Sequence, residues 1–350
     1  MRQPALNEKR NRQILADIVR AYIDTGEPVS SRAISLRHAE SLSPATIRNV
    51  MSDLEEDGYL YQPHTSAGRV PTAAAYRFFV QEYGAHATLS PEDQTFIREQ
   101  LAAAQTPAEI MERASHVLAT LSHGLGIVVS PPLSKLTLEH IRFMALPDGR
   151  LLVVLISQGG ITRDKVVRLD LPLSQDELDR TANFLTRHYI GWTLDAIRAD
   201  LLVLIARERE RYERLAKNAL ALCDPRVLGE DTSAQLYVEG AAQIASAPEF
   251  ADAEQLRELL GAIEEKRKLV ILLTGCIEEP EPVHVQIGIK EIENAGAHLA
   301  LISAPYAFYD RVQGSLGVLG PMRMQYERAI TAVAYVAQLF SKQLSGSERS

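Results

Sequence analysis

One predicted helix carries the side-chain types that read base edges in DNA. Arginine pairs bidentately with guanine and asparagine with adenine, while alanine and threonine methyl groups can touch the methyl group of thymine. At about 100° per residue, the polar face of this helix contains Ala45, Asn49 and Ser52, with Thr46 and Arg48 beside it. The alternative is an ordinary solvated polar face, so the surrounding elements decide between the two interpretations.

The apolar pattern of the same segment predicts where the helix begins, ends and packs. Ser43 suits the N-cap, and Pro44 suits the first helical position, where a missing N–H breaks no hydrogen bond. Gly58 ends the helix. The apolar residues recur at i, i+3, i+4 and i+7, as Ile47, Val50, Met51 and Leu54. The helix therefore buries one face, and its positive N-terminal end beside Ser43 favours a phosphate.

A short polar hairpin follows this helix. Its strands, YLYQ and VPT, enclose the tip PHTSAGR, which lacks any large apolar side chain. We expect Arg69 to enter the minor groove or pair with phosphate, and protonated His64 to donate to phosphate. Ser66 and Gly68, with Thr65 beside them, would let the backbone approach DNA closely. The alternative is an ordered hairpin tip without a ligand.

Two helices precede the reading helix. The first is predicted over residues 8–24, and a short second helix begins after the cap at Ser30 or Ser31. These serines and Arg32 are suited to hold backbone phosphate, a contact that sets register but not sequence preference. Three helices followed by a hairpin predict a winged helix-turn-helix DNA-binding domain over residues 1–83.

The charge of the chain is unevenly distributed. The 350 residues carry a net charge of −8, which argues against an indiscriminate nucleic-acid binder. Residues 1–83 hold ten basic and ten acidic residues, whereas the rest of the chain holds 27 basic and 35 acidic residues. A neutral DNA-binding domain on an acidic chain predicts modest non-specific affinity and tight binding that relies on a dimer.

The sequence contains no constellation typical of an enzyme. Cys223 and Cys276 are too few for a disulfide framework or a four-cysteine zinc site, and neither has a neighbouring histidine as a base. His116 and His123 lack further metal ligands, and the G-x-G at 124–126 precedes a strand instead of a helix. We therefore expect no catalysis, no cofactor and no metal.

The composition is that of an ordinary globular protein, with 46% hydrophobic and 23% charged residues. No apolar run approaches the roughly 18 residues that a membrane span requires. The N-terminus is polar and charged, unlike a signal peptide. We expect a cytoplasmic protein that does not contact a membrane.

Beyond a linker at 84–88, the pattern predicts two helices and then a sheet. The helices open at Ser90 and Thr106, each followed by proline. Short apolar or alternating runs then predict strands at 127–129, 141–146, 151–156 and 166–169. Further strands are predicted at 283–287, 299–303 and 315–319, before a helix at 324–344. We expect one antiparallel sheet, interrupted by an inserted, mostly helical domain.

The predicted insert begins near residue 194 with an unusually long helical pattern. From 194 to 222, residues spaced by four and three form an apolar seam that only Glu208 interrupts. The seam residues are Leu201, Ile205, Glu208, Tyr212, Leu215, Ala219 and Leu222. Two further helices are predicted near 233–245 and 253–266. The periodicity fits a helix that takes part in a dimer and equally an intramolecular bundle.

Three stretches of the chain resemble the HrcA family of heat-inducible transcription repressors. They are RQILADIVRAYIDTGEPVSSRAI, LSPATIRNVMSDLEEDGYLYQPHTSAGRVPT and, at 314–330, GSLGVLGPMRMQYERAI. The resemblance implies an α+β protein in which a GAF-like domain (84–193 and 267–344) is split by an inserted dimerisation domain (194–266). It also implies a dimeric repressor of chaperone operons that binds an inverted repeat, the CIRCE element, and whose activity the GroEL chaperonin supports.

Two alternatives to this function remain open from the sequence. The first keeps the winged helix but makes the GAF-like domain a sensor of a small metabolite, although its strands show no cluster of convergent polar residues. The second makes the winged helix a protein-binding module in an adaptor. Double-stranded DNA, a second copy of the chain and GroEL are the partners that the first interpretation predicts.

Overall fold

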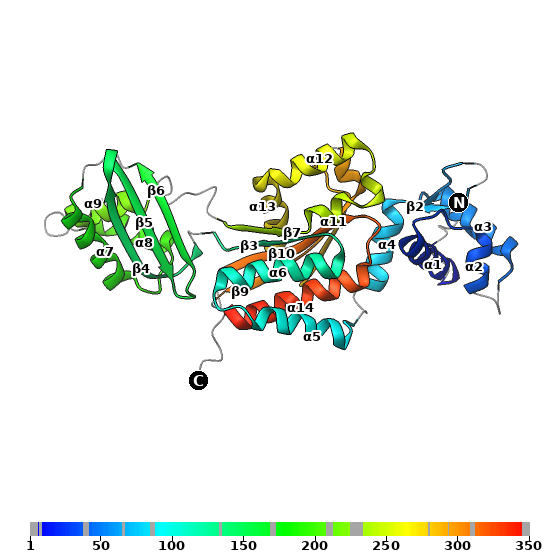
Figure 1. The fold of residues 1–350 in the computed structure, drawn as a ribbon, viewed down its shortest axis with the longest axis horizontal. Helices are drawn as coiled ribbons and strands as arrows, with labels where there is room; N and C mark the ends of the chain where they lie inside the picture. Colours follow the sequence, from blue (N-terminus) through cyan, green and yellow to red (C-terminus); the bar gives the residue numbers. More distant parts are fainter. Residues whose placement is uncertain are drawn as a thin grey trace.

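The computed structural model of the chain shows three lobes in a row (Figure 1). A helical N-terminal lobe lies at one end, a lobe with a five-stranded sheet lies in the middle, and a lobe with a three-stranded sheet lies at the other end. The structure describes residues 6, 9–37, 42–64, 67–84, 88–132, 135–168, 173–207, 213–224, 234–278, 281–292, 294–308 and 312–344.

The N-terminal lobe contains three helices and a hairpin in the predicted order. They are α1 (Lys9–Thr25), α2 (Ser31–Arg37), α3 (Pro44–Glu56), β1 (Leu60–Tyr61) and β2 (Val70–Pro71). The apolar stripe of α3 is buried, as its period indicated, and it packs with fully buried Ile14, Leu15 and Ile18 of α1. This order of elements is that of a winged helix-turn-helix.

A main-chain contact joins the hairpin to the segment between α1 and α2. Val29 N donates to the carbonyl of Arg69 at 2.9 Å, and Arg69 N donates to the carbonyl of Val29 at 2.8 Å. Gly68 makes this approach possible, because a Cβ at that position would lie 2.5 Å from the carbonyl carbon of Val29. The hairpin is therefore held against the helices that precede it.

Three helices lead from the hairpin into the central lobe. They are α4 (Ala73–Tyr83), α5 (Pro91–Ala102) and α6 (Pro107–Ser122). Ser90 and Thr106 cap α5 and α6, because their hydroxyls accept hydrogen bonds from the N–H groups of Asp93 at 3.0 Å and Glu109 at 3.2 Å. The predicted starts of both helices are confirmed.

The central sheet has five antiparallel strands in the order β7-β3-β10-β9-β8. The strands are β3 (Leu125–Val129), β7 (Leu236–Glu239), β8 (His284–Ile287), β9 (Leu299–Phe308) and β10 (Val312–Pro321). Successive residues face opposite sides, so Ile127 and Val128 lie in different hydrophobic cores. Helices α6 and α14 (Tyr326–Leu344) cover one face, and α12 (Ala253–Glu264) and α13 (Lys266–Thr274) cover the other (Figure 1).

The expectation of one interrupted sheet is wrong. The runs at 141–146, 151–156 and 166–169 belong to a separate three-stranded meander, β4 (Leu138–Leu146), β5 (Arg150–Ser157) and β6 (Thr162–Arg168). Tight turns pair these strands with one another, so none of them reaches the central sheet. Leu151, Val153 and Leu155 of β5 are buried on one face of the meander, which α7 (Gln175–Tyr189) covers.

The boundaries of the inserted domain shift accordingly. The separate lobe contains β4 to α9 (Glu213–Leu222), so the expected boundary at 194 lies inside it, before α8 (Leu194–Arg207). The helix expected at 233–245 is instead β7 followed by α11 (Ala241–Ala245). Leu236, Tyr237 and Val238 pair with β3 because strand formers next to an available sheet edge gain a full ladder of hydrogen bonds.

The long helical pattern of 194–222 forms two helices that pack against each other and against α7. Leu201, Ala219 and Leu222 of the predicted seam are fully buried within the chain, which favours the intramolecular bundle over a seam that faces a partner. Glu208 and Tyr212 lie outside the described residues. Among the described residues, no helix combines the length and apolar character required to cross a bilayer.

Candidate nucleic-acid interface

The N-terminus of α3 is fixed by Ser43. The Ser43 hydroxyl accepts a hydrogen bond from the N–H of Thr46 at 3.1 Å and also lies 3.0 Å from the Thr46 hydroxyl. Pro44 occupies the first helical position. Thr46 is half-buried. Because its hydroxyl already contacts the Ser43 hydroxyl, its methyl group is the part most suited to touch a base.

The predicted reading face of α3 is exposed. Ala45, Arg48, Asn49 and Ser52 are all accessible to solvent, whereas the opposite stripe is buried. Within the part of the chain that the structure describes, the side chains of Arg48 and Asn49 make no hydrogen bond or ion pair. Helices α2 and α3 form the outer end of the N-terminal lobe, away from the other two lobes (Figure 1).

The three residues at the start of α2 that were predicted to contact phosphate differ in exposure and in the contacts they already make. The Ser30 hydroxyl caps α2 by accepting from the N–H of Ala33 at 3.2 Å. Ser31 is half-buried, and Arg32 is exposed. Of the three predicted phosphate contacts on this segment, Arg32 carries the charge and can reach phosphate without breaking a contact within the described residues.

Two hydrogen bonds join described residues on either side of the hairpin tip. The N–H of Ala67 donates to the carbonyl of His64 at 2.8 Å, and the Gln62 side chain donates to the carbonyl of Ala67 at 2.9 Å. His64 is exposed. Thr65 and Ser66 lie outside the described residues.

Arg69 makes a contact that the sequence did not predict. Its guanidinium lies 2.8 Å from the Glu55 carboxylate, and its side chain is only 19% exposed. Its main chain is also the partner of Val29. Arg69 therefore ties the hairpin to the end of α3, and a direct contact between Arg69 and DNA stays a prediction.

Two exposed side chains of this lobe were missed from the sequence. Leu36 of α2 is 72% exposed and lies one turn after Arg32 on the same face of the helix. Tyr61 of the hairpin is also exposed. The sequence could have shown this for Leu36. Ile34 is the buried residue of this short helix, and Leu36, two positions later, falls on a different face.

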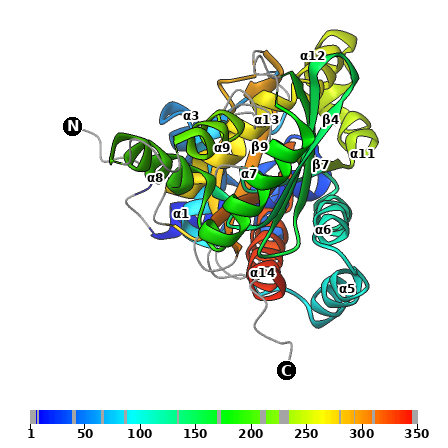
Figure 2. The same ribbon diagram turned by 90° about the vertical axis from the view of Figure 1, so that its left-hand side faces the viewer.

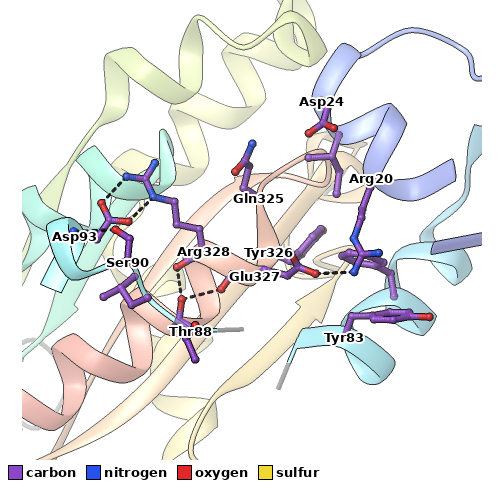
Figure 3. Close-up of a pocket in the computed structure, with 14 residues that line it drawn as sticks. Arg20, Asp24, Tyr83, Thr88, Ser90, Asp93, Gln325, Tyr326, Glu327 and Arg328 are labelled. Carbon is purple, nitrogen blue, oxygen red and sulfur yellow. Dashed lines mark hydrogen bonds and ion pairs between the residues drawn. The ribbon is translucent and has the colours of Figure 1, made fainter. Parts of the chain in front are cut away.

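Arg20 of α1 anchors the N-terminal lobe to the central lobe (Figure 3). Its guanidinium pairs with Glu327 of α14 at 2.9 Å and lies over the rings of Tyr83 and Phe79, at 4.9 and 5.3 Å from their centroids. These residues line a cavity of about 680 Å³. At its far side, Arg328 donates two hydrogen bonds to Asp93 and lowers the pKa of that carboxyl below its ordinary value.

The cysteines and histidines that were considered as nucleophiles or metal ligands form no reactive site among the described residues. Burial raises the pKa of the Cys223 thiol to about 12, so this cysteine is not a nucleophile at neutral pH. Cys276 is also buried, and burial raises its thiol pKa. No group of three or more potential metal ligands, His116 and His123 included, occurs among the described residues.

The chain is similar to known proteins over nearly its whole length. Residues 108–330 match the HrcA protein C-terminal domain. The heat-inducible transcription repressor HrcA of Geobacter sulfurreducens is 38% identical over 339 residues, which are 97% of this chain and 98% of that protein. The chain belongs to the HrcA family. HrcA of Syntrophobacter fumaroxidans is 34% identical, over 96% of this chain and 97% of that one.

Membership of the HrcA family makes this chain a transcription repressor and not an enzyme, as the sequence predicted. The crystal structure of a hypothetical protein is similar with a TM-score of 0.64 and 22% identity, and it covers 97% of this chain and 99% of that one. The similarity to this crystal structure shows that the two chains share a fold, and it carries no information on function.

Proposed function

We propose that this HrcA-family chain represses transcription as a homodimer that places one α3 helix in the major groove at each half of an inverted repeat. The observation that carries the proposal is the pair Arg48 and Asn49, exposed side by side without partners among the described residues. Their side chains supply the hydrogen-bond donors that guanine and adenine edges accept. Arg32 and the N-terminal ends of α2 and α3 would hold the flanking phosphates.

A dimer is favoured by both charge and surface. A single N-terminal lobe without net charge gains little from phosphate neutralisation, so a second half-site is needed for tight binding. The lobe of the three-stranded sheet exposes large apolar side chains that a partner would bury. They are Met144, Val166, Ile190, Trp192, Leu202 and Val203. In Figure 2, which looks onto this lobe, α8 with Leu202 and Val203 lies at the margin of the molecule.

The operator and the chaperone follow from the resemblance to the HrcA family. We propose a CIRCE-type inverted repeat upstream of chaperone genes as the operator, in the cytoplasm. GroEL would support repressor activity by recognising apolar surface of a marginally stable chain. The exposed apolar side chains of the three-stranded lobe supply such a surface when the dimer is dissociated.

Footprinting of the purified protein on its own upstream DNA, with and without GroEL, tests the proposal. We expect protection of an inverted repeat, competition by excess repeat DNA, and no protection of a scrambled sequence of equal length. Equal binding to both sequences would remove the sequence-specific function. Absence of any salt-dependent DNA binding would instead support the protein-binding adaptor.

A further inference from the structure

A second cavity lies where the lobe of the three-stranded sheet meets the central lobe. Its volume of about 650 Å³ falls within the range of roughly 300–1,000 Å³ that is typical of small-molecule sites. The first turns of α6, the turn between β5 and β6, and strand β7 supply its walls. Pro107 and Leu236 give the wall apolar surface, and the almost fully buried Met111 and Ile161 lie behind it.

Arg163 of β6 brings a positive charge to this cavity. One terminal nitrogen of its guanidinium donates to the Ser130 hydroxyl at 2.6 Å, and the other donates to the amide oxygen of Gln235. The Nε atom is buried without a hydrogen-bond partner. Within the described part of the chain, no carboxylate forms an ion pair with Arg163. The cation is therefore held by neutral groups alone.

A half-buried cation with neutral partners is an unfavourable arrangement. Removal from water disfavours the charged form, and here burial lowers the pKa of Arg163 below its ordinary value. An opposite charge is the usual compensation for such a group. Glu112 also lines the cavity, but it is exposed on α6 and is not paired with Arg163. The compensating charge is thus missing from the side chains that surround the guanidinium.

We propose that this cavity binds a small organic acid, with its carboxylate on Arg163 and its hydrocarbon part against Pro107 and Leu236. The planar guanidinium presents a fork of donors that matches the two oxygens of a carboxylate. Inorganic phosphate would satisfy the charge but would leave the apolar wall in contact with water. This cavity is therefore a specific candidate site for the alternative in which the protein senses a small metabolite.

The position of the cavity suggests what binding would change. Ser130 directly follows β3, Gln235 directly precedes β7, and the N–H of Ser130 donates to the carbonyl of Gln235 at 2.9 Å. Arg163 therefore links the lobe of the three-stranded sheet, here called the outer lobe, to both chain segments that connect this lobe to the central sheet. A ligand on Arg163 would alter these contacts with Ser130 and Gln235, which we call the joint. It would thereby alter the spacing of the two DNA-binding lobes in a dimer. This consequence rests on the proposed dimer, whereas binding itself does not.

Thermal unfolding of the full chain with acid and amide pairs tests the site. The probes are acetate, hexanoate and benzoate, each compared with its neutral amide at equal ionic strength, with sodium phosphate as the inorganic anion. The protein variants are Arg163→Gln, the cavity-filling Ala108→Trp, and Arg168→Gln as a control on the same strand outside the cavity. Ala108→Trp leaves Arg163 unchanged, so it separates loss of the ligand from loss of the joint.

We expect hexanoate or benzoate to raise the unfolding temperature of the wild type and of Arg168→Gln by about 2–4 °C. The amides should have no such effect, and both Arg163→Gln and Ala108→Trp should abolish the rise. An equal rise in Arg163→Gln, an equal rise with the amides or with phosphate, or no rise with any acid would each overturn the proposal. Because no DNA is present, failure here leaves the proposed repressor function untouched, and footprinting decides that function separately.

Discussion

The Glu55 and Arg69 side chains lie 2.8 Å apart, as an ion pair between the last turn of α3 and the end of the hairpin tip. The pair holds the hairpin at a fixed angle to the proposed reading helix. It also neutralises the cation that the sequence assigned to DNA. We therefore predict that Glu55 limits the affinity of this lobe for phosphate.

Glu55→Gln should release that charge. We expect the variant to bind random DNA more strongly. We also expect its affinity to depend more steeply on salt, because one added phosphate contact changes the slope of log K against log salt concentration by up to about 0.9. The control is Glu27→Gln, which removes an exposed acid of the same lobe that forms no ion pair with Arg69. An identical slope in both variants would show that Arg69 does not reach phosphate.

Arg48→Ala should reduce sequence selectivity more than it reduces stability. Loss of a bidentate contact removes about 1–3 kcal/mol of discrimination between bases, and the exposed side chain has no partner among the described residues to lose. Titrations with operator and scrambled DNA would measure the change, with Arg98→Ala on α5 as a surface control. Unchanged selectivity in Arg48→Ala would exclude Arg48 as a base-reading residue.

Leu202→Glu should weaken the dimer. Leu202 is 52% exposed on α8, so a carboxylate there costs the folded chain little but would be desolvated in an interface. Analytical ultracentrifugation should show a shift to monomer at micromolar concentrations, together with weaker operator binding. Ile271→Glu on α13 is the matched control, because Ile271 is 57% exposed in the central lobe. A normal dimer in Leu202→Glu would place the interface elsewhere.

The pair between Asp93 and Arg328 should make stability depend on pH. Arg328 lowers the pKa of Asp93 from its ordinary 3.8, so the contribution is present above pH 3.8 and is lost as the pH falls through the lowered value. At pH 7, Asp93→Asn should destabilise by at most about 1 kcal/mol, because solvent screens the pair. Urea unfolding of wild type, Asp93→Asn and the exposed control Asp164→Asn would measure this. A difference from wild type that persists at acid pH would contradict the ion-pair explanation.

The sequence predicted best what depends on neighbours along the chain. The cap at Ser43, the proline after it and the stripe from Ile47 to Leu54 lie within about three turns, so they define α3 without knowledge of the rest. The exposure of Arg48 and Asn49 then follows from the same period. These are the parts of the candidate site that local rules specify.

Contacts between distant segments could not be predicted in the same way. The pattern of β4–β6 identifies strands, but whether they join the central sheet depends on which edges are near, and periodicity carries no such information. Leu236–Glu239 became a strand because β3 offered an edge. Likewise, the partner of Arg69 is Glu55 because the hairpin folds back onto α3, so the sequence showed an unpaired cation where the structure has a paired one.

The adjacency of β3 and β7 in the central sheet has a consequence for how the molecule is put together. The chain leaves the sheet after Val129 and returns at Leu236, two residues that are direct partners in the ladder. The whole outer lobe is thus an enlarged turn of one β-hairpin, with its entrance and exit one strand spacing apart, about 4.8 Å. The ladder of the central sheet is complete without this lobe, so the lobe can move as a unit about its two connecting segments without breaking a hydrogen bond between strands of that sheet.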